Sequence, residues 1–443
     1  MYRIVMVMLL GLALFGSAPV AAQNSGPQPA NPAAEAQAQQ ETIRALLKEV
    51  NDLKARVTAL ESRESAAKPT EAAKPAEQAE PKTTEAAVPA PGNLPGGAEA
   101  LHAGGIKMQG FAAVTYKASD ARPPEGGALL GFRPGSSGNF AVGDIDLFLT
   151  SQLTPKTLIL TEIAFSEQSS GEFETDVERV LLKYDANDYL KMSFGRFHTA
   201  TSYFNSVFHH GGWLQTTADR PFVVEFSDHG GMVPSQAIGA SITGKIPSGK
   251  LGLNYVFEYG TASIIRPQIN VPGAPEIEEH NGNEITGGLF ARPDWLHGLE
   301  VGGSFYHDRI SPAADGVSLG VHMEQSVASA RAVYVTPKFE FLSEGFLIQH
   351  KVQETGQKFN APAFYGLISK QINARWRPFF RFQYANASAA SPLFSDISLR
   401  YGPSLGVRYD LNDYIAFKTQ YDRTMRRGFS SINGMLSQLA FRF

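Results

Sequence analysis

The spacing of apolar residues changes once along the chain, near residue 106. Beyond it, apolar and polar residues alternate with a period of two in segments mostly of 10 to 14 residues, the pattern of strands whose two faces meet different surroundings. Such segments are longer than most strands of soluble proteins and suit tilted strands that cross a bilayer. We predict sixteen strands, at 107–118, 140–153, 156–166, 176–185, 188–198, 236–245, 250–260, 284–293, 298–307, 324–336, 338–351, 360–371, 375–387, 398–410, 413–424 and 433–443.

The connections between these strands alternate in length. Short ones such as 154–155 and 186–187 are followed by long ones such as 119–139, 199–235 and 261–283. Bacterial outer-membrane barrels have an even number of strands, short periplasmic turns and longer extracellular loops. A soluble β-sandwich is the alternative, but it has no reason to keep this asymmetry.

Before the strands, residues 41–64 follow a different period. Their apolar residues are spaced 3, 4, 3, 4 and 3 apart, which is a heptad seam. We therefore predict an all-β fold, a 16-stranded antiparallel transmembrane β-barrel preceded by a short coiled-coil helix; a single amphipathic helix lying on another surface is the alternative. The seam consists of Ile43, Leu46, Val50, Leu53, Val57 and Leu60.

The remaining N-terminal segments lack the pattern of a folded domain. Residues 1–22 have one cation, a short apolar stretch and small residues at the end, which predicts a secretory signal peptide, with a membrane-anchoring helix as the alternative. Residues 23–40 form a flexible segment, and residues 65–105 a tether rich in Pro and Ala. The barrel then occupies 106–443.

Composition excludes several classes of function. With no Cys, the chain has no disulfides, thiol catalysis or Cys zinc site, and a net charge of −4 gives no basic field for nucleic acid. No hydrolase, nucleotide-binding or zinc-protease motif occurs, so we expect no enzyme, no cofactor and no metal. One connection contains several residues that could bind a metal, but their spacing favours packing and hydrogen bonding; they are His209, His210, His229, Asp219 and Asp228.

Alternation also assigns charged residues to the barrel interior, because Lys or Arg on the lipid face costs about 2–4 kcal/mol at mid-bilayer. From residue 371 to the end, ten cations stand against four anions. This favours an anion path, although opposed acidic and basic arcs also occur in nonspecific pores. The predicted pore-lining cations are Arg179, Lys183, Arg375, Arg377, Arg381, Arg400, Arg408, Lys418 and Arg442, and the acids are Asp144, Asp146 and Glu162.

The connection 199–235 is more apolar and aromatic than a free surface loop. We predict that it packs on the inner wall as a constriction loop; a lid on a neighbouring subunit is the alternative. Its candidate residues are His209, His210, Trp213, Arg220 and Asp228.

The last strand ends at Phe443, which resembles the terminal signal of Gram-negative barrels that the assembly machinery reads. The whole pattern resembles trimeric porins with an N-terminal coiled coil, and VERVLLKYDANDYLKMSFGRFHTATSYFN is loosely similar to the phosphate-selective porin O and P family. The resemblance implies a homotrimer and an anion path lined by Arg and Lys.

We therefore expect an outer-membrane porin for passive diffusion of small hydrophilic solutes, with an anion or phosphate preference. Its partners would be membrane lipid, two further copies of the chain, and the barrel-assembly machinery, with the N-terminal segment in the periplasm. The alternative is a protein that tethers the outer membrane to peptidoglycan or a periplasmic partner.

Overall fold

The computed structural model describes residues 105–120, 138–167, 173–208, 212–226, 230–266, 277–314, 317–318, 320–395 and 397–443. The predicted signal peptide, flexible segment, heptad seam and almost all of the tether lie outside the described residues, so these interpretations stay predictions. The described residues belong to one compact unit, Thr84–Phe443.

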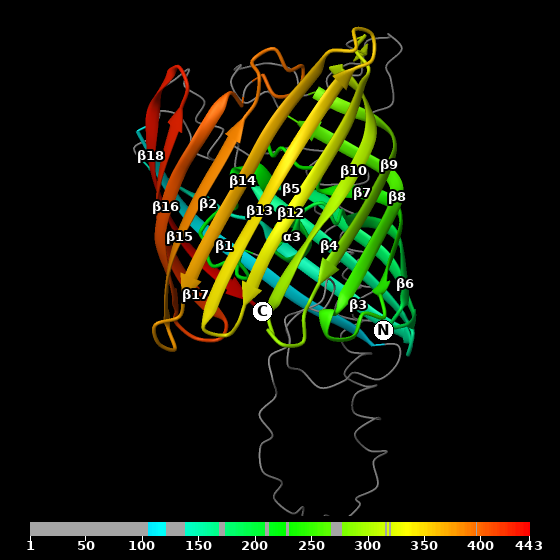
Figure 1. Ribbon diagram of the computed structural model, residues 1–443. Helices are drawn as coiled ribbons and strands as arrows, with labels where there is room; N and C mark the ends of the chain where they lie inside the picture. The colour runs from blue at the N-terminus through cyan, green and yellow to red at the C-terminus, as the bar shows by residue number, and fades with distance from the viewer. Residues whose placement is uncertain are drawn as a thin grey trace, which may run out of the picture. The chain divides into compact units, whose positions relative to one another are not determined.

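Sixteen long antiparallel strands form a closed barrel, which confirms all the predicted strands (Figure 1). Two short strands extend the ladder: β2 pairs with β1 ahead of β3, and β11 pairs with the end of β10. The bounds are β1 Ile106–Ser119, β2 Asn139–Val142, β3 Ile145–Thr154, β4 Thr157–Glu167, β5 Phe173–Asn187, β6 Leu190–His198, β7 Gln236–Lys245, β8 Leu253–Arg266, β9 Ile277–Ala291, β10 Leu299–Ala314, β11 Val317–Ser318, β12 Met323–Val335, β13 Phe339–Val352, β14 Lys358–Lys370, β15 Trp376–Asn386, β16 Leu399–Asp410, β17 Ile415–Arg426 and β18 Phe429–Arg442.

The ends of the barrel close on each other through β1 and β18. Phe111 lies opposite Arg442 in the ladder. The amide of Gly110 donates to the carbonyl of Phe443 at 2.8 Å, and the Phe443 amide donates back at 2.9 Å. A Cβ at Gly110 would overlap the Phe443 ring, so the terminal residue is part of the closing seam.

Three strands near the long connections extend further than their alternation predicts. β8 continues to Arg266, β9 begins at Ile277, and β10 runs to Ala314. Antiparallel backbone pairing does not require an apolar face, so these ladders continue into polar sequence.

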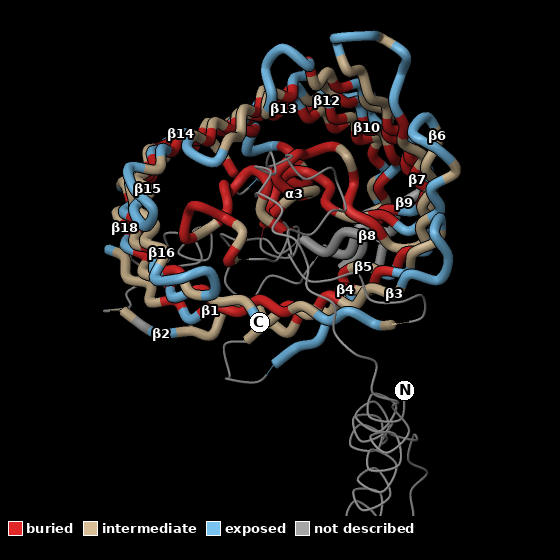
Figure 2. The backbone as a smooth tube through the Cα atoms, turned by 90° about the horizontal axis from the view of Figure 1, so that it is seen from below, coloured by how far each residue is buried: buried red, intermediate tan, exposed pale blue. Residues whose placement is uncertain are grey.

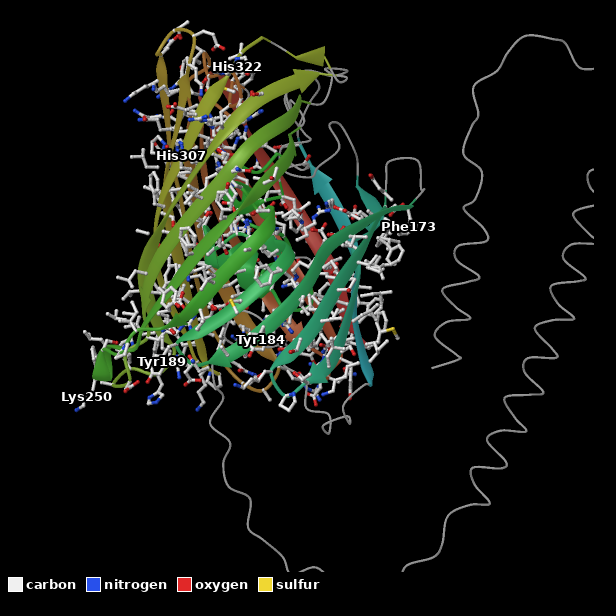
Figure 3. All side chains as sticks on the ribbon, turned by 90° about the vertical axis from the view of Figure 1, so that its right-hand side faces the viewer. Phe173, Tyr184, Tyr189, Lys250, His307 and His322 are labelled. Carbon is white, nitrogen blue, oxygen red and sulfur yellow. The ribbon has the colours of Figure 1, made fainter. Side chains whose placement is uncertain are left out.

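Alternation along the strands separates an apolar outer face from a mixed inner face. In β17, Phe417 and Tyr421 are 41% and 46% exposed, whereas Lys418 and Gln420 between them are 0% and 1% exposed. Figure 3 places Tyr189 and Lys250 at the end with short turns and His322 at the end with longer connections. An apolar outer band with this asymmetry of connections is typical of outer-membrane barrels.

Candidate functional site: the inner loop and the barrel wall

The described parts of the connection between β6 and β7, residues 199–208, 212–226 and 230–235, fold into the barrel interior. They include the short helix α3 (Tyr203–Phe208) and a 3-10 turn, η2 (Phe222–Val224). Figure 2, which looks into the barrel from below, shows buried backbone around α3 within the ring of strands. We call residues 199–235 the inner loop.

Apolar side chains of the inner loop pack against one side of the barrel. Phe204 and Val223 are 1% and 0% exposed, and the Phe204 ring meets the Tyr365 ring edge-on with centroids 5.9 Å apart. Aromatic and aliphatic contacts of this kind supply most of the stabilisation in a core. The wall residues in this core include Tyr306, Ile310, Met323, Val327, Leu342, Phe346, Ile348, Tyr365, Leu367 and Phe379.

A buried glutamate of β13, Glu344, holds the start of α3. Its carboxylate accepts hydrogen bonds from the Tyr203 amide (2.6 Å), the Phe204 amide (3.0 Å) and the Ser202 hydroxyl (3.0 Å). The first amides of a helix have no acceptor within the helix, so a carboxylate there satisfies them and opposes their partial positive charge. The hydroxyl of Tyr365 also donates to this carboxylate, at 2.6 Å, which fixes the carboxylate in turn.

Two more buried glutamates bind the inner loop at other points. Glu258 of β8 accepts from the Ala200 amide at 3.0 Å. Glu340 of β13 accepts from the hydroxyls of Thr216 (2.6 Å) and Ser369 (2.8 Å). Inward-facing acids of this wall are therefore hydrogen-bond acceptors for the loop.

Arg220 fastens the inner loop to itself. Arg220 is 7% exposed. Its guanidinium donates to Asn205 and, at 2.9 Å, to the Val224 carbonyl, and it lies 4.0 Å from the centre of the Phe226 ring. Burial lowers the pKa of Arg220, and the charge of Glu225 opposes that shift. Since arginine stays charged in proteins, this cation stabilises the loop fold from within.

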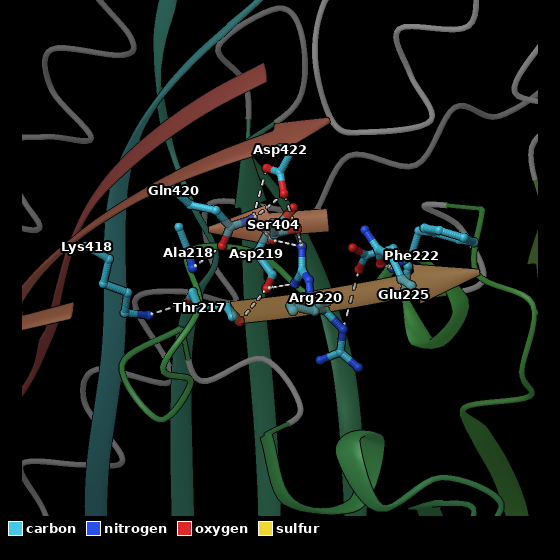
Figure 4. A network of polar contacts seen from close by, with 12 residues as sticks. Thr217, Ala218, Asp219, Arg220, Phe222, Glu225, Ser404, Lys418, Gln420 and Asp422 are labelled. Carbon is cyan, nitrogen blue, oxygen red and sulfur yellow. Dashed lines mark hydrogen bonds and ion pairs between the residues drawn. The ribbon is translucent and has the colours of Figure 1, made fainter. Parts of the chain in front are cut away.

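Arg381 of β15 binds the centre of the inner loop, at Asp219; Figure 4 shows Asp219 close to Ser404, Gln420 and Asp422 of the wall. Its guanidinium donates to the backbone carbonyl of Asp219 at 2.9 Å and to its carboxylate at 2.7 Å. The same guanidinium donates to Ser404 at 3.2 Å and lies 3.6 Å from Asp422. Gln420 donates to the Asp219 carboxylate at 2.6 Å. Paired donors of this kind fix orientation as well as adding stability.

Lys418 and Arg408, from the neighbouring strands β17 and β16, bind loop carbonyls. Lys418 donates to the carbonyl of Gly212 and, at 3.0 Å, to that of Thr217. Arg408 donates to the carbonyl of Trp213 at 2.6 Å and lies 4.7 Å from the centre of the Trp213 ring. Trp213, proposed from sequence as a loop residue, is thus held by the wall.

These contacts change the interpretation of the predicted pore-lining cations on β15, β16 and β17. Arg381 and Lys418 are 0% exposed, Arg400 is 2% exposed, and the Arg408 side chain is 11% exposed. All four face the interior, where loop carbonyls and the Asp219 carboxylate accept hydrogen bonds from Arg381, Arg408 and Lys418. Arg400 instead donates to the Ile397 carbonyl at 3.5 Å and lies 5.5 Å from the centre of the Phe222 ring. Arg381, Arg408 and Lys418 therefore hold the loop.

Three further predicted cations lie near the short turns. Arg377 donates to Gln371 at 3.1 Å, and Arg442 donates to a backbone carbonyl between β16 and β17 at 2.7 Å. Arg375 precedes β15 and donates to the Tyr409 hydroxyl at 3.1 Å. Arg375 lies in the turn before Trp376, the first residue of β15, so strand alternation does not assign it to a face.

The wall formed by β3, β4 and β5 carries a different set of charges. Asp146 and Glu162 are 0% exposed, and Glu162 pairs with the Arg179 guanidinium, which is 14% exposed. Asp144 accepts a hydrogen bond from a β4 serine at 2.7 Å. Lys183 is partly exposed. Asp146 and Glu162 are buried more deeply in this wall than Arg179 and Lys183, whereas Asp144 is half-buried as they are.

Of the five candidate loop residues, the structure describes Trp213 and Arg220; His209, His210 and Asp228 lie outside the described residues. Sequence reasoning missed the acceptors Glu258 and Glu344. Their signal was available, because each is an acid at an inward position of a mostly apolar strand.

Within the described ranges, no helix is both long and apolar enough to cross a membrane. The same part of the chain contains no group of three or more His, Asp and Glu side chains placed to hold a metal ion.

Comparison with known proteins gives structural likeness only. No protein-family model matches the sequence, and no curated protein sequence matches it. The chain is similar in structure to an anion-selective porin from Comamonas acidovorans, with 12% identity, coverage of 76% of this chain and 99% of that one, and a TM-score of 0.51. The outer membrane channel DcaP of Acinetobacter baumannii has 7% identity, coverage of 78% and 99%, and a TM-score of 0.51.

A loop L8 deletion mutant of OmpT, an outer membrane protein of Vibrio cholerae, has 12% identity, coverage of 77% and 100%, and a TM-score of 0.50. All three likenesses extend over nearly the full length of the other protein and over the barrel of this one. The chain therefore has the sixteen-stranded barrel fold of the outer-membrane porins.

Proposed function

We propose that this protein forms a water-filled channel in the outer membrane of a Gram-negative bacterium and passes small hydrophilic solutes, with a preference for anions. The observation that carries the proposal is the closed barrel with an apolar outer face and an inner loop bound to one wall. Barrels of this size can enclose an aqueous channel. Transport through such a channel is passive and requires no chemical step.

Anion preference is supported by the exposure of charges on the β3–β5 wall. The acids Asp146 and Glu162 are fully buried, whereas Arg179 and Lys183 keep part of their surface exposed. A charge that is accessible to solvent acts on a passing ion more directly than one covered by protein. Arg179 and Lys183 are thus more accessible to a passing ion than Asp146 and Glu162 beside them.

The names of the structural neighbours agree with this proposal. One is an anion-selective porin and another an outer membrane channel. At 12% identity or less, the likeness is one of fold, so the electrostatic argument above carries the selectivity.

Reversal potentials in a salt gradient across a planar bilayer test the proposal. We expect stable conductance steps and a reversal potential whose sign shows that anions are more permeable than cations. Replacing Arg179 and Lys183 together with Gln should shift it toward cation preference, whereas Arg423→Gln, on the outer face of β17, should leave it unchanged. Exchanging chloride for phosphate then measures preference between anions. The absence of conductance steps would contradict the channel, and an unchanged reversal potential would contradict the role of the two cations.

We further propose a homotrimer, supported by the resemblance of the sequence to trimeric porins with an N-terminal coiled coil; the heptad seam indicates that copies of the chain associate. Chemical cross-linking of the mature chain should give trimers, and substituting Leu46 and Leu53 with Asp should reduce them. If cross-linking gives only monomers, in the unaltered chain as well as in the variant, this assembly is contradicted.

A further inference from the structure

The outer faces of β10, β12, β13 and β14 change from charged to apolar in ordered rows. The pairing register places each row straight across the four strands. Phe305 and Leu347, in the third row, are 54% and 51% exposed. From the end with longer connections the rows are Arg309, Glu324, Lys351 and Lys358; then His307, Ser326, Gln349 and Asn360; then Phe305, Ala328, Leu347 and Pro362; then Gly303, Ala330, Gly345 and Phe364.

The first row has three cations and one acid. The Lys351 ammonium pairs with the Glu324 carboxylate at 3.0 Å. Lys351 and Lys358 lie directly opposite each other, an arrangement that repels unless an anion lies between or beside them. In the described part of the chain, neither Arg309 nor Lys358 has a carboxylate within ion-pair distance, and both are exposed. The row thus has an unbalanced positive charge.

The second row adds hydrogen-bonding groups below these cations. The ring of His307 is hydrogen-bonded to Ser326 at 3.0 Å, and Gln349 donates to Asn360 at 2.9 Å. Figure 3 places His307 on the outer wall, below His322 and away from Lys250 at the other end. This polar band therefore lies at the edge of the apolar surface with the longer connections.

The fourth row is a shallow depression in the apolar surface. Gly303, Ala330 and Gly345 lie side by side, with the larger Leu347 and Phe364 around them. A Cβ added at Gly345 would meet no atom closer than the Phe364 Cβ, at 4.0 Å. The depression is therefore open from the outside.

We infer that this face binds an anionic, phosphate-bearing membrane lipid, with its phosphate on the basic row, which begins at Arg309 and ends at Lys358, and an acyl chain over the depression. The inference rests on the proposed position of the barrel in a membrane. Charge complementarity selects the headgroup, because the positive row lies directly above the surface that meets acyl chains.

Lipid retention, measured by mass spectrometry of the intact protein released from detergent, tests the inference. Dioleoyl phosphatidic acid is the anionic lipid, dioleoyl phosphatidylcholine the zwitterionic one, and inorganic phosphate the soluble anion. We expect at least about tenfold tighter binding of phosphatidic acid than of phosphatidylcholine, equivalent to about 1.4 kcal/mol.

Three variants locate the site. Replacing Arg309 and Lys358 together with Gln should bring the two lipids within about twofold of each other. Gly345→Leu fills the depression but keeps the cations, and it should weaken the binding of phosphatidic acid severalfold. Arg423→Gln is the matched control, because it removes an exposed outer cation from another part of the barrel. Heat-dependent electrophoretic mobility checks that each variant is folded.

Unchanged lipid preference in the double Gln variant would overturn the inference. Full competition by millimolar inorganic phosphate, with no effect of Gly345→Leu, would also overturn it in favour of a soluble anion site. Retention is measured without conductance, so a barrel that binds the lipid but conducts no ions contradicts only the proposed function.

Discussion

Two walls of the same barrel use charged residues in opposite ways. On the C-terminal side, Arg381 and Lys418 are covered by the inner loop and bind its backbone carbonyls. On the β3–β5 wall, acids such as Glu162 are buried, and Arg179 beside it keeps some exposure. The difference shows that an inward position does not by itself place a charge in contact with solvent, because the packing of a connection decides which wall is covered.

The largest expected effect comes from removing Glu344, which should release the inner loop. Glu344→Ala leaves two helix amides and two hydroxyls without their acceptor, at a cost of about 4 kcal/mol to loop docking. We expect larger or fluctuating single-channel conductance and faster proteolysis within 199–235. Glu354→Gln, in an exposed turn, is the control. Conductance and cleavage equal to those of the unaltered chain would show that Glu344 does not hold the loop.

A smaller effect of the same kind is expected at Arg381. Arg381→Gln leaves Asp219 and Asp422 near each other without their shared cation, at a cost of about 2–4 kcal/mol. Selectivity should move toward cations, and the loop should open at lower denaturant concentration. Arg423→Gln controls for loss of a positive charge elsewhere. If reversal potential and denaturant midpoint both match the unaltered chain, the loop is held from other points.

The closing seam offers a change that leaves both walls intact. Gly110→Ala places a methyl group where the Phe443 ring lies, so closure should cost about 1–3 kcal/mol. A smaller folded fraction, measured by heat-dependent electrophoretic mobility, is the expected result. Gly366→Ala is the control because nothing lies within 4 Å of a Cβ there. Equal folded fractions in both variants would exclude this role for the terminal ring.

The smallest effect is expected at the surface pair of Asp188 and Lys245, which lie 2.8 Å apart and are exposed. The hydrogen bond and charge of Lys245 lower the pKa of Asp188. A carboxyl with a lowered folded pKa stabilises above its unfolded pKa, and this contribution disappears as pH falls through the folded pKa. The thermal unfolding midpoint of Asp188→Asn should therefore be only slightly below that of the unaltered chain at neutral pH, and the two midpoints should be equal in strong acid. A large difference at neutral pH would mean that this turn contributes more than an exposed pair can.

Alternation predicted the strands well because the two faces of a membrane barrel meet different surroundings. Phe380 and Leu405 reach the outer face and Arg381 and Ser404 the inner one, as their parity indicates. The rule does not apply to Arg375, which lies in the turn before β15, and it gave no signal for the polar ends of β9 and β10. Local patterns report the face of a residue, not its neighbours.

The functional site was predicted only in outline. The aromatic composition of 199–235 indicated that it packs on a wall, but the sequence could not show that Glu344 meets Tyr203 or that Arg381 meets Asp219. These partners are 141 and 162 residues apart, and only the closed barrel brings them together. The sequence also gave no indication that Arg179 and Lys183 are more exposed than the cations Arg381, Arg400 and Lys418 near the C-terminus.

The sequence by itself determined the number of strands, their lipid-facing sides and the apolar nature of the inner loop, because these follow from periodicity and composition. The tertiary structure alone decided which charges are covered, since covering depends on contacts between distant segments. It also decided the order of rows on the β10–β14 face, because register between strands aligns residues such as Arg309 and Lys358 that no local pattern relates.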